Sequence, residues 1–444
     1  MASINVNPIR SLKGEIVAPP SKSYSHRAFI AASLAEGVSI IKNPLTLGDV
    51  EITIEILRLL GVKVLKQQDD RYIIEKIQNS FSPYKENIDC RNSGTSVRIF
   101  SALSLLVEGG LTFKGEFFKR NRPILPLLKA LEALGAEYHI SENELTVKRL
   151  TNKCDLVKIP GDISSQFITA LLFVSTLLKC NENDDKDGIE IEITTPLVSY
   201  PYVKITLDVL SSFGINILED LTPEKKGKYY IPYGQKYRPQ VYTIPADFSS
   251  AAFIIAAAAL SPQDSNVIIN NLNPLSPQGD KQILDILQKM GAELQVNEPK
   301  HQVIIRGNTS NYPLQGIEVD CKEIPDLFPI MCVLGALAKG KTTLYNASNL
   351  RFKECDRISV MARELTKMGV KLEEEKDKLT IYQSNLIGTE IDPQKDHRIA
   401  MACIIAALYS NKSSKINQVE VINDSYPNFI KDLNQLGAHI ESIK

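Results

Sequence analysis

The chain has 444 residues, which is enough for two or three domains of ordinary size. Hydrophobic residues make up 43% of the sequence and charged residues 23%, proportions that exclude a disordered or collagen-like protein. The net charge is −1, so no excess of positive charge points to a nucleic-acid or membrane partner. Seven cysteines without a CxxC pair, and five scattered histidines, predict a reduced, cytoplasmic protein that binds no metal.

One pattern recurs six times along the chain. A helical apolar stripe ends in Leu, Met or Phe, a glycine follows, and the sequence then alternates between apolar and polar residues. Glycine ends a helix at little steric cost, and alternation is typical of a strand. The pattern therefore predicts an α/β protein of six modules, each with two helices and several strands. The glycines are Gly61, Gly135, Gly214, Gly291, Gly369 and Gly437.

Six modules predict two domains of three modules each. Proline interrupts the pattern near residues 18–21 and 243–247, where we expect the chain to cross between the domains. With only two crossings, the first residues belong with the C-terminal half. The expected domains are residues 22–243, and residues 1–21 together with residues 244–444.

The segment PPSKSYSHRA, residues 19–28, places small and positively charged residues at an expected helix start. Lys22 and His26 stand four residues apart, as do Ser23 and Arg27, so each pair shares a helix face. Cations beside the free N–H groups of a helix N-terminus suit a phosphate or a carboxylate. An ordinary capped helix end would give the same pattern.

Three further motifs in the N-terminal half have similar features. In RNSGTSVR, residues 92–95 form a small-residue turn that lets N–H groups approach an oxyanion, and a helix is expected from Val97 onward. In RNRPI, Pro123 follows Arg122 and fits a helix start. GDISSQF places three neutral donors before an apolar run: Ser164, Ser165 and Gln166. Each of these three motifs also has a structural explanation, as a loop or as a helix cap.

The C-terminal half combines carboxylates with cations. IPDLFP contributes Asp326, and NLRFKECDR places Glu354 between Lys353 and Arg357. A carboxylate held among cations stays ionised and positioned, as a proton carrier beside an anionic substrate must be. A salt-bridged surface helix is the structural alternative. In KDHRIAM, Arg398 introduces an apolar helix.

Together, the motifs SKSYSHRA, NSGTSVR, SSQF, DFSSAAF, NLRFKECDR and DHRIAM resemble the 5-enolpyruvylshikimate-3-phosphate synthase family, in family order and over essentially the whole chain. The family fold has two domains, each of three βαβαββ units arranged as an inside-out α/β barrel, with the active site in the cleft between them. The resemblance implies transfer of the enolpyruvyl group of phosphoenolpyruvate to the 5-hydroxyl of shikimate 3-phosphate, with release of phosphate. It implies a monomer that needs no cofactor and binds neither nucleic acid nor membrane.

The resemblance also implies residue roles. Asp326 would accept the proton of the 5-hydroxyl, Glu354 would protonate the methylene carbon, and Lys22 would act between both substrates. The residues expected to contact shikimate 3-phosphate are Lys22, Ser23, Arg27, Ser164, Ser165, Gln166, Ser199, Asp326, Asn349 and Lys353. Those expected to contact phosphoenolpyruvate are Lys22, Gly94, Arg122, Gln166, Arg357 and Arg398.

The sequence departs from the family pattern in one charged position. Many members have a lysine just before the late [ST]-[FY]-P motif, whereas Asp424 precedes Ser425 here. If that lysine faces phosphoenolpyruvate, this chain has one cation fewer there, and the affinity for phosphoenolpyruvate or glyphosate-like inhibitors changes.

Three alternative functions fit the sequence less well. The sister transferase that acts on UDP-N-acetylglucosamine relies on a lysine–asparagine start motif and usually a loop cysteine, and the segment 114–122 contains no cysteine. RNA 3′-phosphate cyclases share only the module and need a nucleotidylated histidine. A non-catalytic anion-binding protein would have lost its proton carriers, whereas Asp326 and Glu354 are present.

Overall fold

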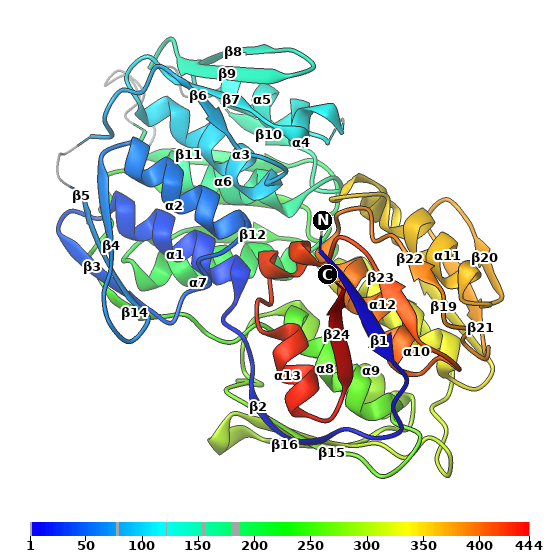
Figure 1. The fold of residues 1–444 in the computed structure, drawn as a ribbon. Helices are drawn as coiled ribbons and strands as arrows, with labels where there is room; N and C mark the ends of the chain where they lie inside the picture. The colour runs from blue at the N-terminus through cyan, green and yellow to red at the C-terminus, as the bar shows by residue number, and fades with distance from the viewer. Residues whose placement is uncertain (1, 77–79, 121, 153–155, 179–186, 444) are drawn as a thin grey trace. The chain divides into compact units, whose positions relative to one another are not determined.

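The computed structural model describes residues 2–76, 80–120, 122–152, 156–178 and 187–443. The chain divides into two compact units, each described here by itself (Figure 1). Unit 1 contains Met1–Ser21 and Pro245–Lys444, and unit 2 contains Lys22–Ile244. Within the described residues each unit holds three four-stranded sheets. The predicted α/β class and its six modules are therefore confirmed.

Unit 2 contains the elements from α1 to β14. Its helices are α1 (Lys22–Leu34), α2 (Asp49–Leu59), α3 (Gly94–Leu103), the 3₁₀ helix η1 (Ser104–Leu106), α4 (Glu116–Lys119), α5 (Leu125–Glu132), α6 (Ser165–Ser175) and α7 (Tyr200–Ser212). Its strands are β3 (Val38–Lys42), β4 (Val62–Lys66), β5 (Arg71–Lys76), β6 (Asn87–Asp89), β7 (Leu111–Lys114), β8 (Ala136–Ile140), β9 (Glu144–Arg149), β10 (Val157–Ile159), β11 (Gly188–Ile193), β12 (Leu218–Leu221), β13 (Gly227–Pro232) and β14 (Val241–Thr243).

Unit 1 contains the first two strands and everything after β14. Its helices are α8 (Phe248–Leu260), η2 (Gly279–Gln282), α9 (Ile283–Lys289), η3 (Glu298–Lys300), η4 (Pro325–Leu327), α10 (Phe328–Leu337), η5 (Ser348–Phe352), α11 (Arg357–Lys367), α12 (His397–Leu408), η6 (Val419–Asp424) and α13 (Phe429–Gln435). Its strands are β1 (Ser3–Asn7), β2 (Lys13–Val17), β15 (Asn266–Asn270), β16 (Glu293–Asn297), β17 (Gln302–Arg306), β18 (Glu318–Asp320), β19 (Lys341–Tyr345), β20 (Leu372–Glu374), β21 (Leu379–Tyr382), β22 (Glu390–Ile391), β23 (Ser414–Ile416) and β24 (His439–Ile443).

All six sheets have the same topology. In the β6-β7-β9-β8 sheet, β6 pairs parallel with β7, and β9 lies antiparallel between β7 and β8. A parallel pair needs a crossover connection, and α3 supplies it here. The chain passes twice from one unit to the other, so three strands pair with partners that are distant in the sequence. Strand β2 pairs with β15, β14 pairs with β3, and β1 completes the sheet of β22, β23 and β24.

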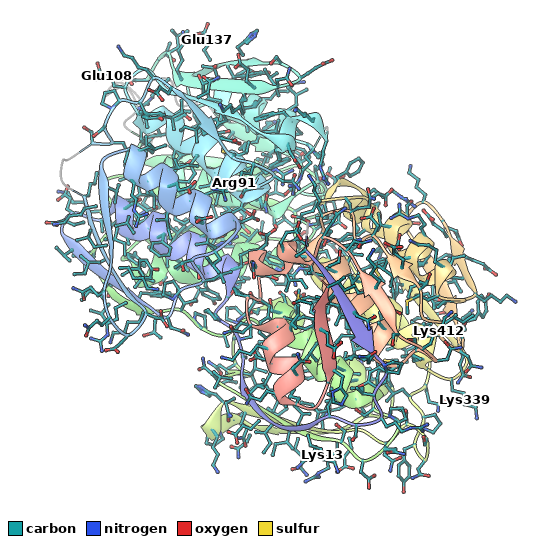
Figure 2. The ribbon with its side chains drawn as sticks, viewed as in Figure 1. Lys13, Arg91, Glu108, Glu137, Lys339 and Lys412 are labelled. Atoms are coloured by element: carbon teal, nitrogen blue, oxygen red, sulfur yellow. The ribbon has the colours of Figure 1, made fainter. Side chains whose placement is uncertain are left out.

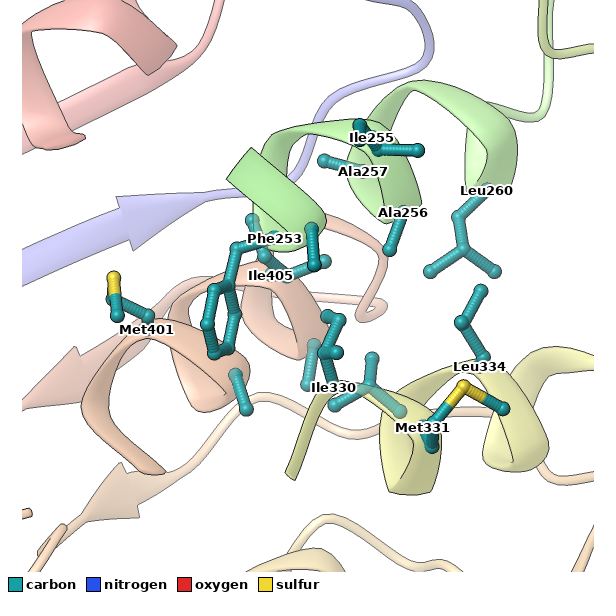
Figure 3. Close-up of a cluster of buried hydrophobic side chains, with 14 of the residues drawn as sticks. Phe253, Ile255, Ala256, Ala257, Leu260, Ile330, Met331, Leu334, Met401 and Ile405 are labelled. Carbon is teal, nitrogen blue, oxygen red and sulfur yellow. The ribbon is translucent and has the colours of Figure 1, made fainter. Parts of the chain in front are cut away.

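The first helix of each module is the buried one. In unit 1 these helices are α8, α10 and α12, and every residue of α8 is buried. A helix that is apolar on all sides must be enclosed by other elements. Figure 3 shows Phe253, Ile330 and Met401 from these three helices packed in one cluster. The corresponding helices of unit 2 are α1, α3 and α6, and α3 packs against both α6 and α2. The helix starts that concern the site thus come from the core of each unit.

Two of the repeated glycines allow a matched test of this packing. Gly135 and Gly214 both have φ of +84°, after the second helix of a module. A Cβ on Gly135 would lie 2.2 Å from the backbone oxygen of Thr151, whereas one on Gly214 would meet only the side chain of Arg238, at 3.1 Å. A left-handed alanine costs about 1–2 kcal/mol. A clash with rigid backbone adds about 1–3 kcal/mol.

We therefore expect Gly135→Ala to lower the free energy of unfolding more than Gly214→Ala does. Urea unfolding of the two variants measures the difference. Equal losses would mean that the backbone around Thr151 relaxes freely.

Further observations concern the membrane and the thiols. No helix in the described ranges is both long enough and apolar enough to cross a membrane. Among the described residues the cysteines are free thiols: Cys90, Cys321, Cys332, Cys355 and Cys403. Cys154 and Cys180 lie outside the described residues.

Candidate functional site

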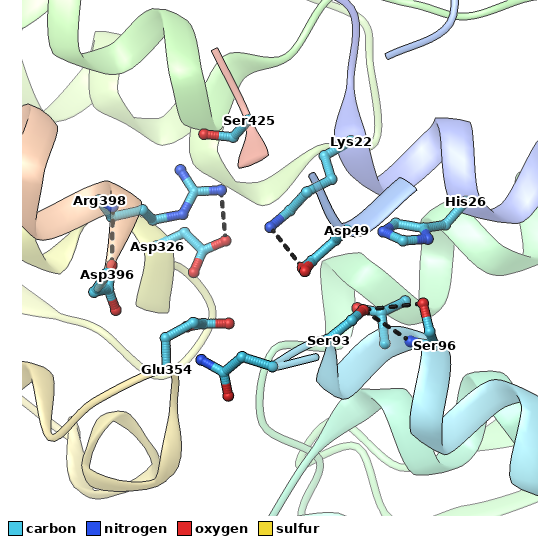
Figure 4. Close-up of polar contacts among 12 residues, drawn as sticks. Lys22, His26, Asp49, Ser93, Ser96, Asp326, Glu354, Asp396, Arg398 and Ser425 are labelled. Carbon is cyan, nitrogen blue, oxygen red and sulfur yellow. Dashed lines mark hydrogen bonds and ion pairs between the residues drawn. The ribbon is translucent and has the colours of Figure 1, made fainter. Parts of the chain in front are cut away.

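In unit 2 the first candidate residues lie in the first turn of α1. Lys22 and Ser23 are its first two residues, and Lys22 Nζ lies 3.4 Å from the Oδ2 atom of Asp49, the first residue of α2. Figure 4 shows this ion pair as a dashed line. The Lys22 side chain is 13% exposed, so its ammonium group is available at the edge of the core.

Arg27, one turn further along α1, is buried with a 3% exposed side chain. Its Nε donates to Thr206 Oγ1 at 2.8 Å, and its Nη1 donates to the carbonyl of Ser23 at 2.9 Å. Its Nη2 donates to Thr169 Oγ1 and to the carbonyl of Tyr202, both at 3.2 Å. Burial lowers the pKa of Arg27 to about 10, so the guanidinium is charged at neutral pH. Because these acceptors are neutral, Arg27 keeps a positive charge that an anion can neutralise.

The start of α3 differs from expectation. The helix begins at Gly94, three residues before the expected Val97. Ser93 is the reason, because its Oγ accepts a hydrogen bond from the backbone N–H of Ser96 at 3.2 Å and so caps the helix. The small-residue turn is thus a helix N-terminus, a place where the first backbone N–H groups can approach an oxyanion, as the sequence predicted.

Arg122 lies against this helix start. A Cβ on Gly94 would be 2.7 Å from Arg122 Nη2, so only glycine lets the guanidinium approach so closely. Arg122 donates to the carbonyl of Asn92 at 2.8 Å, and its guanidinium carbon lies 5.2 Å from the centre of the Phe117 ring. The prediction that Pro123 starts a helix is wrong, since α5 begins two residues later and carries Pro126 in its first turn.

The GDISSQF motif forms the start of α6. Ser164 caps the helix by accepting from the N–H of Gln166 at 3.3 Å, and Ser165 is its first residue. The amide of Gln166 is fixed on both sides: its Oε1 accepts from Arg98 Nη1 at 2.6 Å, and its Nε2 donates to Thr95 Oγ1 at 3.0 Å. The motif therefore connects the N-termini of α3 and α6.

Ser199 precedes α7 and has a left-handed backbone with φ of +56°. The side chain is 3% exposed, and its hydroxyl has no hydrogen-bond partner among the described residues. Buried hydroxyls are normally satisfied. A ligand oxygen at this position would satisfy Ser199.

In unit 1 the candidate residues are organised around one buried guanidinium. Arg357, the first residue of α11, is 1% exposed and contacts three carboxylates. Its Nε lies 2.7 Å from Asp396 Oδ2, its Nη1 2.7 Å from Asp326 Oδ1, and its Nη2 2.9 Å from Glu354 Oε2. Burial alone would lower the pKa of Arg357, but the carboxylates raise it well above its usual value. A salt-bridged surface helix is therefore the wrong interpretation of this segment.

Asp326 is held by a second arginine as well. Arg398 Nη2 lies 2.9 Å from Asp326 Oδ2, as Figure 4 shows. Burial alone would raise the pKa of Asp326, but the positive charges of Arg398, Arg357 and Lys353 outweigh it, so the pKa is far below its usual value. Asp326 is therefore ionised in this structure.

Two predicted residues lie in the segment before α11. Asn349, in η5, is 7% exposed, and its Oδ1 has no hydrogen-bond partner among the described residues. Lys353 follows η5 directly and adds positive charge near Asp326. Lys353 and Arg357 do not share a helix, because α11 begins only at Arg357.

Two buried acids near these groups were not predicted from the sequence. Asp396 is fully buried, caps α12 through the N–H groups of Arg398 and Ile399, and holds Arg357. An aspartate just before an apolar helix is a cap signal that could have identified its first role. Asp280 accepts a hydrogen bond from Ser249, and burial, with the negative charge of Asp326, raises the pKa of Asp280 to about 7. We find no sequence signal for Asp280.

Not every charged residue of the motifs belongs to the site. Arg91, labelled in Figure 2, contacts Glu51 at 3.0 Å and Glu55 at 3.3 Å, and its side chain is 53% exposed. Exposed pairs of this kind contribute little. The buried groups are chemically distinct: unit 2 offers cations and hydroxyls at helix starts, and unit 1 offers two carboxylates on shared arginines. The first set suits anion binding and the second suits proton transfer beside an anion.

Comparison with known proteins gives concordant results. The model of the EPSP synthase family, described as 3-phosphoshikimate 1-carboxyvinyltransferase, matches residues 6–433. A relative of that name from Methanocaldococcus jannaschii is 42% identical over 438 residues, with 97% of each chain covered. Another, from Methanococcus vannielii, is 41% identical over 439 residues, covering 97% of this chain and 98% of the relative.

Solved structures agree at the level of the fold. An EPSP synthase from Acinetobacter baumannii matches with a TM-score of 0.80 at 24% identity, over 100% of both chains. The enolpyruvyl transferase NikO from Streptomyces tendae matches with a TM-score of 0.74 at 18% identity, covering 100% of this chain and 99% of the other.

Proposed function

The chain belongs to the EPSP synthase family, and we propose that it transfers the enolpyruvyl group of phosphoenolpyruvate to the 5-hydroxyl of shikimate 3-phosphate and releases phosphate. The observation that carries this proposal is the position of Asp326 and Glu354 on the single guanidinium of Arg357, at 2.7 and 2.9 Å. The reaction needs one proton removed from oxygen and one delivered to carbon, so two fixed carboxyl groups suit it.

The chemistry proceeds by addition and elimination. The 5-hydroxyl oxygen attacks C2 of phosphoenolpyruvate, its proton goes to Asp326, and Glu354 delivers a proton to the methylene carbon. The tetrahedral adduct then loses phosphate together with a proton from the new methyl group, which restores the double bond. The arginines neutralise the charge of the substrate and of the departing phosphate.

The arginines also explain how an ionised Asp326 becomes a useful base. In the ligand-free chain, Arg357 and Arg398 hold the pKa of Asp326 far below its usual value, despite its burial. A carboxylate whose pKa is held far below its usual value is a weak base. When the phosphate and carboxylate of phosphoenolpyruvate bind these arginines, their positive charge is shared with the ligand, and the pKa of Asp326 rises. Substrate binding thus activates the base.

The substrate contacts that we propose are those implied by the family resemblance. Arg27 with its neutral acceptors supports a phosphorylated ligand. The oxygens of Ser199 and Asn349, which have no hydrogen-bond partner within the described ranges, support a ligand with hydroxyl groups. For shikimate 3-phosphate the set is Lys22, Ser23, Arg27, Ser164, Ser165, Gln166, Ser199, Asp326, Asn349 and Lys353. For phosphoenolpyruvate it is Lys22, Gly94, Arg122, Gln166, Arg357 and Arg398. We also propose that the enzyme is a cytoplasmic monomer and needs no cofactor, and its free thiols are consistent with a reducing compartment.

The proposal is tested by the acceptor dependence of phosphate release. The purified chain is incubated with phosphoenolpyruvate alone, with shikimate 3-phosphate, or with UDP-N-acetylglucosamine. We expect release only with shikimate 3-phosphate, in equal amount to the enolpyruvyl product. Release with UDP-N-acetylglucosamine would show that shikimate 3-phosphate is the wrong acceptor. No release with either acceptor would overturn the proposed reaction.

A further inference from the structure

A continuous line of buried polar side chains joins the first three helices of unit 2. His26 Nδ1 lies 2.8 Å from Thr53 Oγ1, Thr53 Oγ1 lies 3.2 Å from Ser96 Oγ, and Ser96 Oγ lies 3.0 Å from Ser93 Oγ. All four side chains are at most 1% exposed. We call these four residues the polar relay; Figure 4 labels His26, Ser93 and Ser96.

Only the last link of the relay has a fixed direction: Ser93 Oγ accepts the N–H of Ser96 as the cap of α3 and donates its own proton to Ser96 Oγ. Between Ser96 and Thr53, and between Thr53 and His26, either group can be the donor. Both tautomers of a neutral His26 continue the relay, because Nδ1 can donate to Thr53 or accept from it, and Nε2 has no hydrogen-bond partner among the described residues.

The neutral state of His26 is consistent with its surroundings. Burial, followed by the charges of Lys22 and Arg27, lowers the pKa of His26 well below its usual value. The charged group on the facing side of α2 is Asp49, one turn before Thr53, and it is paired with Lys22.

The relay also fixes how α1 and α2 are aligned. Lys22 contacts Asp49 at 3.4 Å, and His26, four residues later, contacts Thr53, four residues after Asp49. Residues four apart share one face of a helix, so the two contacts lie one turn apart along the two helices. The second contact continues through Ser96 to the cap of α3.

We propose that the polar relay positions the N-terminus of α3 for phosphoenolpyruvate, and that His26 is a positioning residue acting through Thr53 and Ser96. Gly94 is the first residue of that helix, and Arg122 lies against it. The inference rests on the proposed function, in which Gly94 and Arg122 bind phosphoenolpyruvate. Binding of shikimate 3-phosphate should be much less affected by loss of the relay, because Arg27 is held by Thr169, Thr206 and backbone carbonyls outside the relay.

The kinetic test removes single hydroxyls. Thr53→Val and Ser96→Ala each interrupt the relay, and we expect the KM for phosphoenolpyruvate to rise about five- to tenfold, the effect of one lost hydrogen bond. The KM for shikimate 3-phosphate should stay within about twofold. The double variant should be no worse than the worse single variant, because both changes break the same line. Thr112→Val is the matched control: it removes a threonine pair of 3.0 Å between β7 and β9, and both KM values should be unchanged.

Two results would overturn the inference. An unchanged KM for phosphoenolpyruvate would exclude a positioning role. Equal increases in both KM values, with a lowered melting temperature, would show that the relay only stabilises unit 2.

A measurement on the resting protein separates failure of the relay from failure of the proposed function. In ¹⁵N-histidine-labelled protein we expect His26 to stay neutral from about pH 5.5 to about pH 8. In Thr53→Val the Nδ1 resonance should shift, whichever tautomer the ring adopts. Titration in this range, or an unchanged Nδ1 resonance in Thr53→Val, would overturn the relay even if the enzyme turns over normally. Absence of turnover with a neutral His26 and a shifted Nδ1 resonance would overturn only the role toward phosphoenolpyruvate, together with the proposed reaction.

Discussion

Replacing Glu354 with glutamine is expected to lower turnover at least about a hundredfold, while shikimate 3-phosphate binds with nearly unchanged affinity. Glutamine keeps the size of the side chain and can still accept a hydrogen bond from Arg357, whose Nη2 lies 2.9 Å from Glu354 Oε2. It cannot deliver a proton to carbon. The loss should therefore appear in kcat, and calorimetric titration with shikimate 3-phosphate should give a dissociation constant close to that of the wild type.

Glu374→Gln provides a control of the same chemistry in the same unit. Glu374 Oε1 lies 3.1 Å from Arg351 Nη1 and accepts a hydrogen bond from Ser359 Oγ at 2.6 Å, on the exposed side of α11. This change also converts a carboxylate beside an arginine into an amide, so turnover should be unaffected. Full turnover by Glu354→Gln would remove Glu354 from the proton-transfer role.

The repeat could be predicted because its signals are local. A glycine after an apolar stripe ends a helix wherever it occurs, and alternation follows from strand geometry. Gly135 and Gly214 have the left-handed backbone that this interpretation requires. Helix starts were less accurate, because the capping residue and not the first apolar residue sets where a helix begins. Ser93 moves the start of α3 to Gly94, and the first turn of α5 uses Pro126 in place of Pro123.

The site could be predicted only in part, for a physical reason. Cations at element boundaries are visible in the sequence, and Arg357 and Arg398 are buried beside Asp326 in the structure. The partner of a buried charge depends on tertiary contacts. Asp396 contacts Arg357 across 39 positions of sequence, and Asp280 accepts from Ser249 across 31. No local pattern specifies such pairs, so these acids were missed.

Asp396 is the position in unit 1 where we expect the largest loss of stability. Asp396→Ala removes the cap of α12 and leaves Arg357, 1% exposed, without its contact at 2.7 Å. Removing one partner of a buried ion pair costs about 3–5 kcal/mol, because the remaining charge is no longer compensated. Urea unfolding monitored with a probe in unit 1 should show a decrease of this size in the free energy of unfolding.

Asp356→Ala separates the cap from the buried ion pair, because Asp356 has the same two functions in a partly exposed setting. It caps α11 through the N–H of Ser359 at 3.1 Å and contacts Arg351 at 2.8 Å, but its side chain is 35% exposed. Here we expect a loss of only about 1 kcal/mol, the value of a cap. Equal losses in the free energy of unfolding of the two alanine variants would mean that the buried ion pair of Asp396 adds nothing beyond the helix cap. Asp326 and Glu354 would then suffice to compensate Arg357, and the guanidinium would not need its third carboxylate to remain buried.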